Sequence, residues 1–250
     1  MKNFRIILLF NFSFLFLDNF SASAQLKWQN VDSIFQPLPK SVHIFYTNTP
    51  VDTGAFQAYY LEADLKDKNL DFTVDTTLNR RITPENFYEK NHKPVLVVNC
   101  AFFSFASNRS VNVIVKKGNL ICFDTSYVKG RGKDSLRHYF ALRSSIGFNK
   151  KNEADVAWVA ADSTMIYPLV SESPKKPLLL EESFPKKPDF MSDIRIREYL
   201  KPGRKEEKIS KWKMRTVVGG GPALLQNGEV NISNEEEMLF AGKALNDKHP

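Results

Sequence analysis

The sequence lacks the short motifs by which the commonest enzyme classes are recognised. It contains no Gly-x-Ser-x-Gly, no His-Glu-x-x-His, no Gly-x-x-x-x-Gly-Lys phosphate loop and no Cys-x-x-Cys. Histidine is scarce as well, and the 4 residues of this type are not spaced as metal ligands would be. We therefore expect neither a metal site nor a bound cofactor.

Cysteine is equally scarce, since only Cys100 and Cys122 occur in the chain. Both lie in apolar runs that are typical of strands, where a buried free thiol is the usual outcome. Two free thiols are therefore favoured. A disulfide remains open, because it depends on the distance between the two Cα atoms, which the sequence does not give.

Long apolar runs are absent except near the start. A short basic beginning leads into the run Ile6–Leu17, and Ala22-Ser23-Ala24 then supplies the small residues that signal peptidase requires. The run is too short to cross a bilayer as a helix of about 20 residues, which disfavours an uncleaved anchor. We predict a signal peptide at 1–24, no transmembrane segment after its removal, and a periplasmic or secreted protein. N-terminal sequencing of the protein recovered from the envelope or medium should begin at Gln25, and an intact Met1 would refute export.

The charge balance favours anionic partners, because the net charge is +7. Such partners include phosphorylated glycans and membrane surfaces, and no nucleic-acid partner is expected.

The order of expected elements indicates an α+β fold with mostly antiparallel strands and two or three peripheral helices. Residues 25–56 form an irregular lead-in with an edge strand at Val42–Tyr46, and 57–250 form the main domain. Val95–Val98 is uniformly apolar, which is typical of a strand buried on both faces. Further strands are expected at Gln57–Leu65, Leu70–Val74, Val111–Val115, Leu120–Phe123, Tyr139–Phe148, Val156–Val159 and Thr216–Val218, and helices after Thr83, near Asp193–Leu200 and at Ser233–Asn246.

Residues 171–213 differ in composition from the rest of the chain. A Pro-Lys-Lys-Pro run occurs twice, at 174–177 and 185–188, and a charged stretch follows. This pattern indicates an insertion loop with one short helix. Its lysines could form an anion-binding rim, although a solvated excursion is the commoner use of such charges.

Three segments carry residues suited to a polar ligand. Asn99 follows the expected buried strand, and an amide there can donate and accept without titrating. Arg143 stands beside two serines, as in a clamp for phosphate or carboxylate. Gly219-Gly220-Gly221 allows backbone N–H groups to approach an anion closely. Each has a structural alternative, namely a strand cap, an ion pair and a tight turn.

The order of these motifs resembles the phosphodiester glycosidase family, which includes the uncovering enzyme of the mannose 6-phosphate pathway and many exported bacterial proteins. The likeness runs from about Ala58 to the end of the chain, through Asn-x-x-Phe-Phe, Arg-Ser-Ser-Ile-Gly and Gly-Gly-Gly-Pro-x-Leu-x-x-Asn-Gly. It implies hydrolysis of the glycosidic bond of sugar 1-phosphodiesters. It implies catalytic roles for Asn99 and Arg143, and substrate-binding roles for Phe103, Gly219, Gly220, Gly221, Asn227 and His249.

The chemistry of the implied reaction does not require two carboxyl groups. A phosphate leaving group has a second pKa near 6, so it departs without much help from a general acid. No carboxylate within the matched motifs is a convincing base for the attacking water, and none is assigned.

The sequence departs from the family at its end. Family members continue after His249-Pro250 with a His-Pro-Arg-Thr-Ala-like segment, further strands and an Asp-Gly-Gly-Gly-Ser-like motif. The resemblance thus predicts that the 250-residue chain is incomplete as a fold and hydrolyses nothing alone. The alternative is a non-catalytic glycan-binding protein of the cell envelope with the same fold.

Overall fold

The computed structural model describes residues 26–51, 54–76, 81–124, 126–130, 132–180, 190–201 and 209–239. Two compact units make up the chain, Met1–Asp64 and Leu65–Pro250. The expected signal peptide and His249 lie outside the described residues. None of the helices in these described ranges has the length and apolar character needed to cross a membrane.

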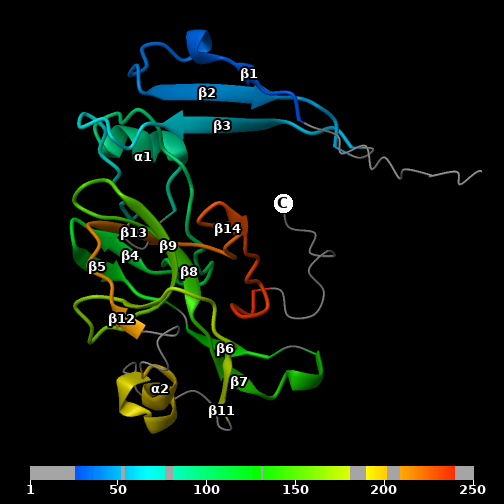
Figure 1. Cartoon of the computed structure of the whole chain (residues 1–250), viewed down its shortest axis with the longest axis vertical. Coiled ribbons are helices and arrows are strands. Elements are labelled where there is room, and N and C mark those ends of the chain that lie inside the picture. Colours follow the sequence, from blue (N-terminus) through cyan, green and yellow to red (C-terminus); the bar gives the residue numbers. More distant parts are fainter. Residues whose placement is uncertain are drawn as a thin grey trace, which may run out of the picture. The chain divides into compact units, whose positions relative to one another are not determined.

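The first unit contains an antiparallel sheet of three strands in the order β1-β2-β3 (Figure 1). These are β1 (Gln29–Asn30), β2 (Val42–Thr47) and β3 (Ala58–Ala63), with a 3₁₀ turn η1 (Asp32–Ile34) after β1. β2 buries Val42 and Ile44 and exposes His43 between them, as the two-residue period of a strand requires. β2 is the middle strand, where an edge strand was expected, because the short β1 pairs along its free side.

The second unit is built on a curled antiparallel sheet of seven strands in the order β12-β10-β9-β8-β13-β4-β5. A three-stranded sheet, β11-β7-β6, and the hairpin β14-β15 accompany it. The bounds of these strands are β4 Ile114–Lys116, β5 Asn119–Cys122, β6 Tyr127–Lys129, β7 His138–Phe140, β8 Arg143–Phe148, β9 Ala154–Ala160, β10 Leu169–Ser171, β11 Leu178–Leu180, β12 Ile209–Lys211, β13 Thr216–Gly219, β14 Leu225–Gln226 and β15 Glu229–Val230.

Two short α-helices lie where the sequence predicted them, the first from its start signal at Thr83 and the second near Asp193–Leu200. α1 (Pro84–Lys90) begins after Thr83, whose hydroxyl accepts the N–H of Asn86 at 3.2 Å. α2 (Ile194–Tyr199) begins after Asp193, whose carboxylate accepts the N–H of Arg195 at 2.8 Å. The hairpin β4-β5 is also confirmed, with Lys117 and Gly118 in left-handed conformations at its turn.

The expected α+β class is wrong, because helices make up only 11% of the described structure and the fold is predominantly β. Part of the difference lies at Ser233, where a capping box was expected to open a helix at Ser233–Asn246. The Ser233 hydroxyl instead donates to the side chain of Glu237, and residues 234–238 form turns. Glu237, whose carboxylate also accepts from Ser144 and Trp158 on distant strands, therefore takes the hydroxyl that would have capped the helix. Residues 240–250 lie outside the described residues.

Two further strand predictions are wrong. Val95–Val98 forms no strand, and Val95, Leu96 and Val98 are exposed by 52%, 48% and 61%. No described strand pairs with this segment, so its apolar character does not reflect burial in a sheet. Leu70–Val74 is also irregular, although its Phe72 ring stacks on Phe148 at 4.9 Å and so joins the sheet by its side chain.

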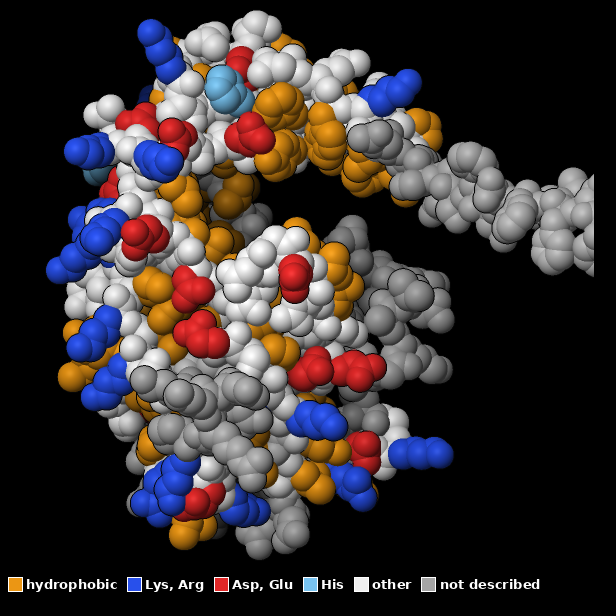
Figure 2. Space-filling model, in the orientation of Figure 1, with side chains coloured by type: hydrophobic (Ala, Val, Ile, Leu, Met, Phe, Trp, Pro, Cys, Tyr) orange, Lys and Arg blue, Asp and Glu red, His pale blue; other side chains and the backbone are white. Residues whose placement is uncertain are grey.

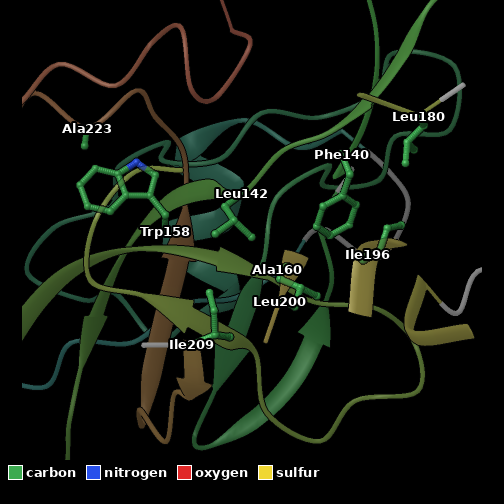
Figure 3. Close-up of a cluster of buried hydrophobic side chains, with 9 residues drawn as sticks. All are labelled: Phe140, Leu142, Trp158, Ala160, Leu180, Ile196, Leu200, Ile209 and Ala223. Atoms are coloured by element: carbon green, nitrogen blue, oxygen red, sulfur yellow. The ribbon is translucent and has the colours of Figure 1, made fainter. Parts of the chain in front are cut away.

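The segment 171–213 contributes to the folded core as well as to its surface. β12 forms an edge of the large sheet by pairing with β10, and β11 pairs with β7. The larger hydrophobic cluster joins side chains from this segment to those of the sheet, as Figure 3 shows. Its members are Phe140, Leu142, Trp158, Ala160, Leu180, Ile196, Leu200, Ile209 and Ala223.

Candidate functional site

The three segments singled out in the sequence meet near the end of β13. The N–H of Gly219 donates to the Val113 carbonyl at 2.8 Å, and the N–H of Gly220 donates to the Ser144 carbonyl at 3.3 Å. The segment around Asn99 reaches the same place, because a Cβ at Gly220 would lie 2.9 Å from the Cys100 carbonyl oxygen. Residues more than 100 positions apart in sequence thus come together.

The glycine run is packed closely against the protein's own groups. Gly221 has a φ of +111°, which a side chain rarely adopts. A Cβ there would also lie 2.5 Å from Oε2 of Glu237 and 2.6 Å from Oγ of Ser144. The glycines therefore allow the protein's own groups to pack closely against the backbone. This is the use expected of them in a tight turn, the structural alternative for this motif.

Glu237 is the centre of the site and was not identified from the sequence. Its side chain is fully buried, and it accepts five hydrogen bonds. Oε2 accepts the N–H and the hydroxyl of Ser144 at 2.9 and 3.1 Å. Oε1 accepts the hydroxyl of Ser233 at 2.5 Å, Trp158 Nε1 at 3.2 Å and the N–H of Ala223 at 3.2 Å. These donors hold a charge that burial alone would disfavour.

Arg143 opens β8 and lies beside two acidic groups. Its guanidinium donates through Nη1 to the backbone carbonyl of Glu237, and the residue is only 9% exposed. Burial lowers the pKa of this guanidinium, and the charges of Asp124 and Glu237 raise it. Its positive charge is thus partly offset inside the protein before any ligand binds.

Asp124 follows β5 and was not identified from the sequence either. Burial raises the pKa of its carboxyl to about 7, against the opposing effects of the Val113 N–H and the charge of Arg143. Oδ1 accepts that N–H at 2.8 Å, whereas Oδ2 has no hydrogen-bond partner among the described residues. A buried carboxyl that titrates near neutral pH beside an arginine is the usual signature of an acid–base site.

Two hydroxyl groups share this unsatisfied state. Oγ of Ser126 and Oγ of Ser145 are buried without a hydrogen-bond partner in the described part of the chain. Ser145 follows Arg143 by two positions on β8, and Ser126 follows Asp124 by two. Buried polar atoms are rarely left unpaired. Oδ2 of Asp124, Oγ of Ser126 and Oγ of Ser145 are therefore candidates for contact with a ligand.

The other expected site residues are less closely involved. Asn99 is exposed and lies next to Cys100, so it borders the site at Gly220. Phe103 is 43% exposed, and the Arg81 guanidinium lies 5.7 Å from its ring. Asn227 occupies the β14-β15 turn with a φ of 52°, a conformation that this turn requires.

The two cysteines are free thiols in the structure. Cys100 is exposed, against the expectation of burial, and Cys122 is half-buried. Desolvation raises the pKa of both thiols, so neither is an activated nucleophile. Within the described ranges, no group of three or more His, Cys, Asp or Glu side chains is arranged as a metal site.

The chain matches no family model, no curated protein and no solved structure. The function of the site is therefore inferred from the sequence pattern and from the geometry of its residues.

Proposed function

We propose that this site belongs to an exported hydrolase that cleaves the glycosidic bond of sugar 1-phosphodiesters. The observation that carries the proposal is the meeting of Arg143, Asp124 and Glu237 with the glycine run. The Arg143 motif and the glycine run are among those whose order in the chain resembles the phosphodiester glycosidases. The proposed substrate is anionic, in keeping with the net charge of +7.

The reaction divides naturally among these side chains. Water attacks the anomeric carbon, the bond from that carbon to the phosphate oxygen breaks, and the phosphomonoester leaves with the electron pair. Asp124, with a pKa near 7, is suited to accept the proton of the attacking water. Arg143 has five N–H donors, one of which holds the Glu237 carbonyl, and it is the cation for the leaving phosphate.

The reaction is tested with the protein and a diester of a sugar 1-phosphate with a simple alcohol, and the release of free sugar is the readout, because the alcohol stays on the phosphomonoester. Hydrolysis in ¹⁸O-labelled water distinguishes the two possible bond cleavages. Attack at the anomeric carbon places the label in the released sugar, which supports the proposal. Label in the phosphomonoester would instead indicate attack at phosphorus and contradict it.

Replacing Arg143 by lysine should reduce kcat/KM by roughly 100-fold or more, because a point charge does not reproduce the planar guanidinium. The measurement is steady-state hydrolysis by the folded variant, with Arg137→Lys as the control, since Arg137 is exposed and pairs with Asp134. Unchanged turnover by Arg143→Lys would assign Arg143 to a structural ion pair.

A non-catalytic glycan-binding protein is the second candidate. It is favoured by the burial of Asp124 and Arg143, which are exposed by only 7% and 9%, because side chains so buried have little surface with which to contact a substrate. Binding of the diester by the complete gene product without release of sugar would support this second candidate over the hydrolase.

A further inference from the structure

A hollow lies on the first unit, and none of the residues that line it belongs to the candidate site described above. It has a volume of about 270 Å³ and is lined by Trp28, Phe45, Tyr60 and Glu62. Clefts that bury drug-sized ligands are larger, at about 300–1,000 Å³. The hollow is thus of a size for one small ring.

The strand register explains how three aromatic rings come together. Phe45 on β2 and Tyr60 on β3 are direct cross-strand partners, so both side chains lie on the same face of the sheet. The centroids of these two rings are 5.8 Å apart, and the centroid of the Trp28 ring also lies 5.8 Å from that of Tyr60. The Lys27 N–H donates to Thr49 Oγ1 at 3.1 Å, which fixes the segment that carries Trp28.

These rings are exposed to solvent despite their size. Trp28 is 40% exposed and Tyr60 is 46% exposed. Figure 2 shows hydrophobic side chains, tyrosines included, at the surface over this sheet, with acidic side chains and a histidine near them. Several exposed aromatic side chains in contact with one another are a common feature of binding sites.

The rim of the hollow supplies hydrogen-bonding groups. Glu62 lies two residues beyond Tyr60 on the same face and accepts the Tyr60 hydroxyl through Oε1 at 3.0 Å. His43 is the cross-strand partner of Glu62, and its Nδ1 lies 2.8 Å from Oδ2 of Asp32. The hydrogen bond from the His43 ring lowers the pKa of Asp32 to about 2, so this carboxyl is ionised at neutral pH. Two carboxylates disfavour an anionic ligand here.

We propose that this hollow binds one neutral sugar ring of a glycan, by stacking of the ring's C–H face on Trp28 and Tyr60 and hydrogen bonding of its hydroxyls to Glu62. A cationic ligand is the main competitor, because aromatic rings with a carboxylate also suit ammonium groups. The arrangement favours the sugar. Phe45 and Tyr60 share one face of the sheet with an angle of 33° between their rings, and the Trp28 ring is tilted by 55° from Tyr60. The three rings thus line a shallow hollow, whereas a cage for a cation surrounds a single point.

The experiment measures binding of cellopentaose, chitopentaose, maltopentaose and mannopentaose to the 250-residue chain, with choline as the cationic probe. Quenching of tryptophan fluorescence by acrylamide reports on Trp28, since Trp158 and Trp212 are 0% and 5% exposed. At least one oligosaccharide should shield Trp28 with a Kd of about 1 mM or tighter. By calorimetry, Trp28→Ala and Tyr60→Ala should each weaken that binding by about tenfold or more.

Tyr59→Ala is the matched control. Tyr59 is the adjacent residue on β3, it is 66% exposed, and its ring contacts Tyr46, so it lies on the opposite face. Its loss should leave binding unchanged. Glu62→Ala, which keeps all three rings, should weaken binding several-fold and guards against loss through misfolding of the aromatic variants.

Three results would overturn the proposal. They are the absence of shielding by all four oligosaccharides at about ten times the expected Kd, shielding by choline alone, and equal loss of affinity in Tyr59→Ala and Tyr60→Ala. The proposal does not depend on the hydrolase function, because the diester assay and the oligosaccharide titration use different ligands and different variants.

Discussion

Replacing Glu237 by alanine is expected to lower the free energy of unfolding by about 3–5 kcal/mol. The variant leaves the donors of Ser144, Ser233 and Ala223 without their acceptor inside the protein. Trp158 Nε1 keeps a second acceptor, Oγ of Ser233 at 3.0 Å. Each unsatisfied buried donor costs about 1–3 kcal/mol unless water reaches it. The variant also removes a negative charge that favours the protonated form of the buried Arg143 guanidinium. Since a domain of this kind is stable by about 5–15 kcal/mol, the loss would be a large fraction of the total stability.

The measurement is urea denaturation followed by tryptophan fluorescence. Glu235→Ala provides a matched control, because Glu235 lies on the same turn and is exposed. It should change the stability by less than about 0.5 kcal/mol. Similar stabilities for the two variants would show that the network around Glu237 does not hold this part of the chain in place.

The second large effect is a change in the pH dependence of stability at Asp124. Burial raises the pKa of the folded protein's carboxyl from 3.8 to about 7, so the folded state binds more protons than the unfolded state between these values. Stability contributed by this group is therefore fully present below pH 4 and is lost as the pH rises through 7. At 1.36 kcal/mol per pKa unit, the loss amounts to as much as about 4 kcal/mol.

Asp124→Asn should remove this dependence, since an amide does not titrate in the range. Unfolding is measured in urea at about pH 4.5 and about pH 8, and the wild-type chain should lose stability between them relative to the variant. The exposed Asp134 provides the reference variant, Asp134→Asn. Parallel pH profiles for the wild type and Asp124→Asn would mean that Asp124 keeps an ordinary pKa and is unsuited to the proposed role as base.

Local signals in the sequence predicted local structure well. Thr83 and Asp193 were followed by helices, and the turn at Lys117-Gly118 joined two strands, because each of these depends on residues only a few positions apart. Val95–Val98 failed for the opposite reason. A uniformly apolar run says that a segment can be buried, but a strand also requires a partner, and pairing is a tertiary property.

The same distinction applies to the candidate site. The sequence named Arg143 and the glycine run as separate candidate site residues, and the backbone hydrogen bond from Gly220 to Ser144 shows that their segments are neighbours. Glu237 could not be found, because it is one of three consecutive glutamates and nothing local distinguishes it from Glu235 and Glu236. Its difference lies in the donors that Ser144 and Trp158 bring from distant strands.

The packing of α2 changes how residues 171–213 can be treated in practice. Their composition is that of a removable excursion, and a designer would choose them as the place to shorten the chain or insert a tag. Ile196 is fully buried in the same cluster as Phe140 and Trp158, and Leu200 is 5% exposed beside it. Excision would therefore open a hole in the centre of the second unit. The side chains at the buried positions Ile196 and Leu200 are therefore constrained in volume, as those of a core strand are.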